Sequence, residues 1–149
     1  MNIPQNRNQN NLKPKITALA ITLNEEDNVK RYIQSLSFAD EIIFIDSNST
    51  DATVAIAKEL GVKVIQRNFD DFSKQRNFAV EQAKNDWIIF FDLDEIITPE
   101  LGKEIIAVTA SQNKITAFYV KSNFHFMGKE IKYGGWKSKK SIRVFNKQF

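Results

Sequence analysis

The stretch FFDLDEI holds the most chemically suggestive spacing in this 149-residue chain, because Asp92 and Asp94 flank one residue directly after an apolar run. Side chains alternate along an extended chain, so an extended backbone here would point both carboxylates the same way. Two such carboxylates repel each other unless a cation balances them. Their hard oxygen atoms suit Mg²⁺ or Mn²⁺, which would bridge to a diphosphate. The alternative is a solvated acidic turn that also caps a helix beginning near Thr98.

A further acidic residue, Asp46, ends another apolar run and precedes the small polar residues SNST. A carboxylate there can accept hydrogen bonds from a nucleotide base or a ribose hydroxyl, or it can cap the next helix. Lys74 and Arg76 lie further along the chain, where they would either meet phosphate or form surface charges on an amphipathic helix. The pattern alone leaves both alternatives open.

The composition excludes several classes of site. The chain has no Cys, which excludes disulfides, thiolate zinc sites, iron–sulfur clusters and Cys nucleophiles. Its one His, His125, lies between Phe residues, where a structural role is expected, so any metal must be held by oxygen ligands. Neither G-x-G-x-x-G nor a P-loop motif occurs. No apolar run approaches bilayer length and the first residues do not resemble a signal peptide, which predicts a cytoplasmic location.

Strand and helix signals alternate along most of the chain, which predicts an α/β fold with a mainly parallel sheet flanked by helices. The carboxyl ends of parallel strands share one edge, so the polar groups after the first, second and fourth strands should converge there. After residue 113 the pattern changes to an antiparallel addition, with strand-forming composition over 115–126 and a second strand within GKEIKYGGW. The predicted core strands are Ile16–Leu23, Glu41–Asp46, Val62–Gln66 and Trp87–Phe91, with a helix at about 73–84.

The chain is expected to form a flexible leader over residues 1–14 and a single domain over 15–149. Residues 114–149 hold nine of the 21 Lys and Arg residues but one of the 18 acidic ones, Glu130. Such a basic end can attract phosphate or an anionic membrane surface, or it can be a solvated lysine face. Nucleic-acid binding is the weakest alternative, since no recognised motif accompanies the charge.

Five segments, in order, resemble family 2 glycosyltransferases with the GT-A fold. They are ITLNEEDNV, FIDSNSTDAT, FSKQRNFAVEQAKNDWIIFFDLDE, TPEL and YGGW…SIRVFNK, and the resemblance covers about residues 15–147. The last segment is similar to a subgroup that includes the lipopolysaccharide core β-1,4-glucosyltransferases acting on heptose.

The resemblance implies a set of roles for individual residues. Asp46 would bind the base or ribose, Asp92 would approach the ribose or sugar, and Asp94 would ligate the divalent cation, Mg²⁺ or Mn²⁺. Apart from the resemblance, Trp136, which follows Gly134 and Gly135, would be either an acceptor platform or a core residue. The remaining nucleotide-sugar contacts would come from Thr22, Asn24, Glu25 and Arg76.

The resemblance also implies an inverting enzyme that moves a hexose from a nucleotide sugar to a lipopolysaccharide-core or other glycolipid or polysaccharide acceptor, and a UDP-sugar is the expected donor. Inversion needs a general base, which in the family lies beyond the segment that ends near Phe149, so no catalytic base is assigned. The acceptor's charge would suit the basic end and peripheral contact with an anionic membrane at its inner face. The alternative is a truncated, non-catalytic module that binds nucleotide sugars.

Overall fold

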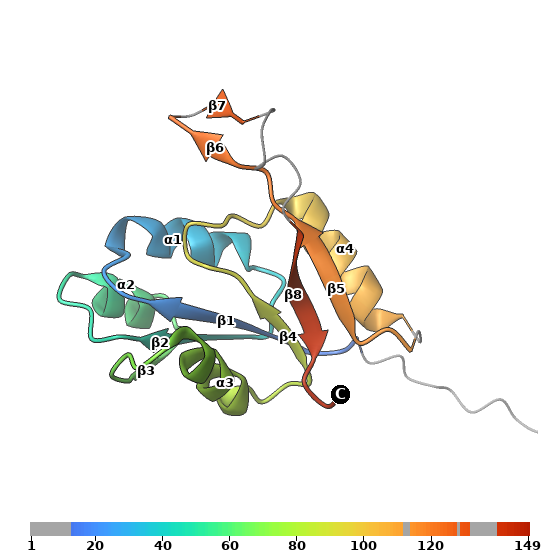
Figure 1. The fold of residues 1–149 in the computed structure, drawn as a ribbon, viewed down its shortest axis with the longest axis horizontal. Coiled ribbons are helices and arrows are strands. Elements are labelled where there is room, and N and C mark those ends of the chain that lie inside the picture. The colour runs from blue at the N-terminus through green and yellow to red at the C-terminus, as the bar shows by residue number, and fades with distance from the viewer. Residues whose placement is uncertain (1–12, 112–113, 128, 132–139) are drawn as a thin grey trace, which may run out of the picture.

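The computed structural model describes residues 13–111, 114–127, 129–131 and 140–149, which form a six-stranded sheet in the order β3-β2-β1-β4-β8-β5 (Figure 1). The first four strands along the chain are parallel to one another, as predicted. They are β1 (Ile16–Thr22), β2 (Glu41–Asp46), β3 (Lys63–Gln66) and β4 (Trp87–Phe90). The α/β fold class predicted from the sequence is therefore confirmed.

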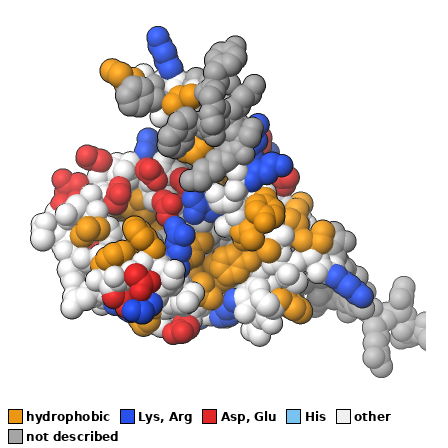
Figure 2. All heavy atoms as spheres, in the orientation of Figure 1, with side chains coloured by type: hydrophobic (Ala, Val, Ile, Leu, Met, Phe, Trp, Pro, Cys, Tyr) orange, Lys and Arg blue, Asp and Glu red, His pale blue; other side chains and the backbone are white. Residues whose placement is uncertain are grey.

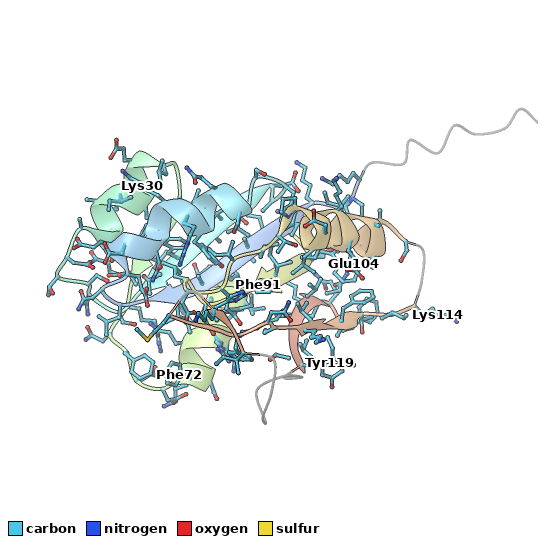
Figure 3. All side chains as sticks on the ribbon, turned by 90° about the horizontal axis from the view of Figure 1, so that it is seen from above. Lys30, Phe72, Phe91, Glu104, Lys114 and Tyr119 are labelled. Carbon is cyan, nitrogen blue, oxygen red and sulfur yellow. The ribbon has the colours of Figure 1, made fainter. Side chains whose placement is uncertain are left out.

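Helices cover the two faces of the sheet unequally. Helices α1 (Glu26–Ser35), α2 (Thr53–Glu59) and α4 (Pro99–Ala110) contribute to one hydrophobic cluster, whereas α3 (Phe72–Gln82) packs on the opposite face. Ala18 and Ala20 of β1 point into the first cluster and Leu19 into the second, as the two-residue period of a strand requires. Figure 3 shows Lys30 and Glu104 on one side of the sheet and Phe72 on the other.

Local signals explain where two helices begin and end. Thr98 caps α4 by accepting a hydrogen bond from the Leu101 backbone N–H at 3.2 Å, and Pro99 follows as the first helical residue. Gly61, at φ +80°, ends the α2 region, because glycine adopts this left-handed conformation without steric cost. Asn24, a residue type that often caps helices, does not cap α1, because Glu25 occupies the N-cap position without a side-chain cap. Asn24 instead adopts φ 54° and binds the neighbouring loop.

The C-terminal part is an antiparallel addition, as predicted, but its strands pair in a different way. β5 (Ala117–Lys121) lies within the predicted strand region, but the partner beside it in the main sheet is β8 (Lys140–Asn146), inserted between β4 and β5 and antiparallel to both. In the described part of the segment predicted to supply the second strand, β7 (Lys129–Glu130) pairs with β6 (His125–Phe126) in a separate hairpin. None of the helices in the described part of the chain is both long and apolar enough to span a bilayer.

Candidate functional site

The loops that follow β1, β2 and β4 emerge at one edge of the sheet, as the sequence predicts. β1 and β2 are parallel and in register, so that Thr22, the last residue of β1, pairs with Asp46, the last residue of β2. β4 is parallel to β1 on its other side and ends at Phe90, directly before the acidic turn. Three polar loops from distant parts of the sequence therefore share the edge at which open α/β sheets bind ligands.

Asp46 is fully buried and organises the loop that follows it. Its Oδ1 accepts hydrogen bonds from Thr22 Oγ1 at 3.0 Å and from Ser49 Oγ at 2.5 Å. Its Oδ2 accepts from the Ser49 backbone N–H at 2.9 Å and from Gln66 Nε2 at 3.5 Å. The predicted residues Thr22 and Asp46 thus meet, but the carboxylate is occupied by protein donors and Thr22 serves it as a donor.

Asn24 and Glu25 connect the β1–α1 loop to the β2–α2 loop. The Asn24 backbone N–H donates to Ser49 Oγ at 2.9 Å, and Asn24 Oδ1 accepts from the Thr50 backbone N–H at 2.8 Å. The Glu25 backbone N–H donates to Thr53 Oγ1 at 2.7 Å. These bonds fix two loops against each other, which gives Asn24 a positioning role that its motif alone does not reveal.

The Asp92–Glu95 segment forms a tight turn. The Glu95 backbone N–H donates to the Asp92 carbonyl at 2.9 Å, and the Asp92 backbone N–H donates to Glu95 Oε2, also at 2.9 Å. The expectation that Asp92 and Asp94 point the same way assumed an extended chain, and this assumption is wrong because the chain turns at Leu93 and Asp94. Asp94 is exposed, and its side chain forms no hydrogen bond or ion pair with the described residues.

Two arginines approach this turn from different elements. Arg143 of β8 lies 3.3 Å from Asp92 Oδ2 and 2.8 Å from Glu95 Oε1 through the same guanidinium nitrogen, Nη2. Arg76 of α3 lies 3.5 Å from Asp92 Oδ1 and stacks 5.5 Å above the Phe90 ring. Arg76 was among the predicted site residues. Glu95 belongs to the acidic group expected after the fourth strand but had no predicted role, and Arg143 was missed although it lies in the segment SIRVFNK. Lys74 instead pairs with Asp71 at 3.2 Å, near the start of α3.

Tyr32 of α1 supports the turn from the opposite face of the sheet. Its buried hydroxyl donates to the Phe91 carbonyl at 3.0 Å. Burial raises the pKa of Tyr32 strongly, and the charges of Asp92 and Glu95 raise it further, while Arg143 lowers it. The hydroxyl therefore stays protonated at neutral pH and donates this hydrogen bond.

A cavity of about 450 Å³ adjoins the arginines, between α3 and β8. Apolar side chains cluster beside Lys and Arg side chains on this face (Figure 2). The residues that line the cavity are Arg76, Asn77, Val80, Glu81, Phe90, Ile142, Arg143, Phe145, Lys147 and Phe149.

The predicted acceptor-side residue, Trp136, lies outside the described residues.

A metal ion at this edge would take few ligands from the protein. Among the described residues, no group of three or more His, Cys, Asp or Glu side chains is placed to hold one. Mg²⁺-type sites for phosphate substrates commonly use one or two carboxylates and complete the coordination with phosphate oxygens and water. The exposed, unpaired carboxylate of Asp94 fits that type of site, whereas Asp92 already faces two guanidinium groups.

Residues 17–146, nearly the whole described domain, match the profile of glycosyl transferase family 2. The chain belongs to this family. An uncharacterized glycosyltransferase of Rickettsia typhi is 38% identical over 138 residues, covering 91% of this chain and 47% of the relative. The lipopolysaccharide core biosynthesis glycosyltransferase LpsC of Rhizobium meliloti is 27% identical over 121 residues, covering 78% of this chain and 45% of LpsC. The chain thus spans about half the length of these two relatives.

Solved glycosyltransferases share the fold. Residues 1–349 of S. aureus TarS superpose with a TM-score of 0.56 at 30% identity, over 62% of this chain and 31% of that solved chain. Glucosyl-3-phosphoglycerate synthase of Mycobacterium tuberculosis, solved with Mn²⁺, UDP and phosphoglyceric acid, superposes with a TM-score of 0.59 at 22% identity. That match covers 70% of this chain and 42% of the synthase. Together with the sheet order and the flanking helices, these matches identify the GT-A glycosyltransferase fold.

Proposed function

We propose that this chain carries the donor-binding part of an inverting glycosyltransferase that takes a hexose from a nucleotide sugar. The observation that carries the proposal is the placement of three loops at one sheet edge, where the exposed carboxylate of Asp94 lies in the same turn as Asp92, which contacts Arg76. A nucleoside diphosphate needs such an edge, because its phosphates require cationic or N–H partners and a bridging cation.

The donor is proposed to be a UDP-sugar bound with Mg²⁺ or Mn²⁺. The mycobacterial synthase, similar in fold, was solved with UDP and Mn²⁺, which supports this choice. In this chain, Asp94 would hold the cation. Arg76 is half-exposed and its contact with Asp92 is long, at 3.5 Å, so its side chain would be able to turn toward a phosphate. The bound cation would neutralise the charge that develops on the departing diphosphate.

The nucleoside end would lie over the β1–α1 and β2–α2 loops. Asp46 and Thr22 are buried below that surface, so we propose that they shape the pocket through Ser49 and that Asn24 and Glu25 hold its wall. This arrangement would orient backbone groups of the two loops for a base or a ribose hydroxyl.

The acceptor is proposed to be a lipopolysaccharide-core or other glycolipid or polysaccharide, and the similarity to LpsC supports it. The basic segment 114–149 would face this acceptor at the cytoplasmic side of an anionic membrane. Binding to phosphatidylglycerol vesicles that falls as salt rises is expected, and equal binding to neutral vesicles would remove the membrane contact from the proposal.

Calorimetry tests the donor proposal. UDP in the presence of Mn²⁺ is titrated into the wild type, Asp94→Ala and, as a matched exposed acidic control on α4, Glu104→Ala. Loss of a charged ligand should weaken UDP binding by about tenfold or more in Asp94→Ala, while the control binds as the wild type. Equal affinities of Asp94→Ala and the wild type would remove Asp94 from the cation site.

A non-catalytic module that binds nucleotide sugars is the alternative function. A transfer and hydrolysis assay with several UDP-sugars distinguishes the two, because both would bind UDP. Turnover by the 149-residue chain would exclude the module, and UDP binding without turnover would favour it.

A further inference from the structure

We propose that Arg143 of β8 is a positioning residue for the donor site: it holds the Asp92–Glu95 turn and reserves Asp92 and Glu95 for structure, leaving Asp94 to face the cation. This inference rests on the proposed function at the same edge. It assigns a role to a residue from the C-terminal strand, whose place beside β4 the sequence did not reveal.

The backbone of β8 aims Arg143 at the turn. Phe118 and Tyr119 are consecutive in β5, yet they pair with Val144 and Ile142 of β8, so Arg143 is an extra residue between them. A β-bulge of this kind redirects the side chain of the extra residue, and bulges are frequent beside active sites. The irregularity in β8 therefore coincides with the residue that reaches the acidic turn.

The guanidinium of Arg143 binds the turn at several points. Its Nη2 bridges Asp92 Oδ2 at 3.3 Å and Glu95 Oε1 at 2.8 Å, and its Nη1 donates to the Phe90 carbonyl at 3.3 Å. The same group lies 5.8 Å from the centre of the Phe91 ring. The side chain is only 13% exposed, so these charge-assisted bonds are little screened by solvent. A planar, five-donor group suits this geometry and an ammonium group does not.

These contacts divide the three carboxylates of the motif between two tasks. Asp92 and Glu95 are balanced by Arg143, and Glu95 also accepts the Asp92 backbone N–H. Asp94 alone has no protein partner among the described residues. A cation that meets this turn therefore encounters one unpaired carboxylate on a fixed backbone, and the position of that carboxylate depends on Arg143.

The test compares Arg143→Met and Arg143→Lys with Lys58→Met, which removes one exposed positive charge from α2. UDP affinity is measured by calorimetry with Mn²⁺ and with EDTA, and amide exchange of residues 91–97 is followed by mass spectrometry. We expect Arg143→Met to reduce the gain in UDP affinity from Mn²⁺ and to speed exchange of the turn, each by about tenfold. UDP affinity in EDTA should stay unchanged. A general loss of stability would instead lower UDP affinity both with Mn²⁺ and with EDTA.

Arg143→Lys keeps the charge and most of the apolar stem. This variant therefore tests the proposal if Arg143→Met does not fold. Because lysine cannot bridge the two carboxylates with a planar fork, this variant should also lose most of the Mn²⁺-dependent gain. Full retention of the gain and of slow turn exchange in both Arg143 variants, or the same loss in Lys58→Met, would overturn the proposal. Absence of UDP binding by the wild type would instead refute the proposed function, and exchange of the turn would still test the role of Arg143.

Discussion

The two acidic regions at the sheet edge are built differently. Asp46 has no exposed surface and accepts four hydrogen bonds from hydroxyl, backbone and amide donors. The Asp92–Glu95 turn is partly exposed, and two arginines balance Asp92. Neutral donors around a buried carboxylate fix a loop rigidly, whereas the half-exposed guanidinium of Arg76 beside an open turn can exchange its partner for an incoming phosphate. We infer that the first region shapes the nucleoside pocket and the second one holds the reacting diphosphate.

Asp46→Asn should break the first region and produce the largest loss of stability. The new amide group would face donors and leave buried hydrogen-bonding groups without partners, so we expect a loss of about 3 kcal/mol in the free energy of unfolding. Urea denaturation measures it. Asp94→Asn is the matched control in the second region, where an exposed side chain should change stability by less than about 0.5 kcal/mol. Similar losses in both variants would contradict the division of roles.

Tyr32→Phe should loosen the second region, the Asp92–Glu95 turn, by removing its support from α1. It removes the hydrogen bond to the Phe91 carbonyl and leaves that carbonyl without its donor, which should cost about 1 kcal/mol in the free energy of unfolding. Urea denaturation gives the value, and faster amide exchange at 91–95 than at 47–50 would locate the effect in the acidic turn. Equal acceleration in the two loops would mean that they are one cooperative unit.

An exposed ion pair in the β3–α3 loop gives the smallest expected effect. The hydrogen bond from Arg67 lowers the pKa of Asp70 to about 2, below the ordinary carboxyl value of about 4. A carboxyl whose folded pKa is lowered stabilises the fold above the unfolded pKa and loses that contribution as pH falls toward 2. The decline of stability between pH about 4 and about 2 should thus be shallower in Asp70→Asn, as thermal unfolding across this pH range measures. An unchanged slope would show that the pair is screened by solvent.

The sequence predicts the parallel half of the fold well, because buried parallel strands read as continuous apolar runs and Thr98, Pro99 and Gly61 are strong local signals. It does not predict the insertion of β8 between β4 and β5, since non-local pairing leaves little trace in composition. The same limit applies to the site. The motifs predicted Asp46, Asp92 and Arg76 as site residues, but two of the partners that satisfy Asp46, Thr22 and Gln66, come from the ends of the neighbouring strands β1 and β3. The partnership of Arg143 with the turn depends on a bulge that no local pattern shows.

The most direct test of a shared donor site is a two-dimensional NMR experiment on the ¹⁵N-labelled chain with UDP and either Mg²⁺ or Mn²⁺. With Mg²⁺–UDP, we expect the amide signals of residues 47–50 to shift. Replacement by Mn²⁺ should broaden those of residues 92–95 most strongly, since the paramagnetic ion would sit beside Asp94. Broadening centred on α4 or on β6 and β7, with residues 92–95 unaffected, would contradict the central claim that both acidic regions serve one nucleoside diphosphate.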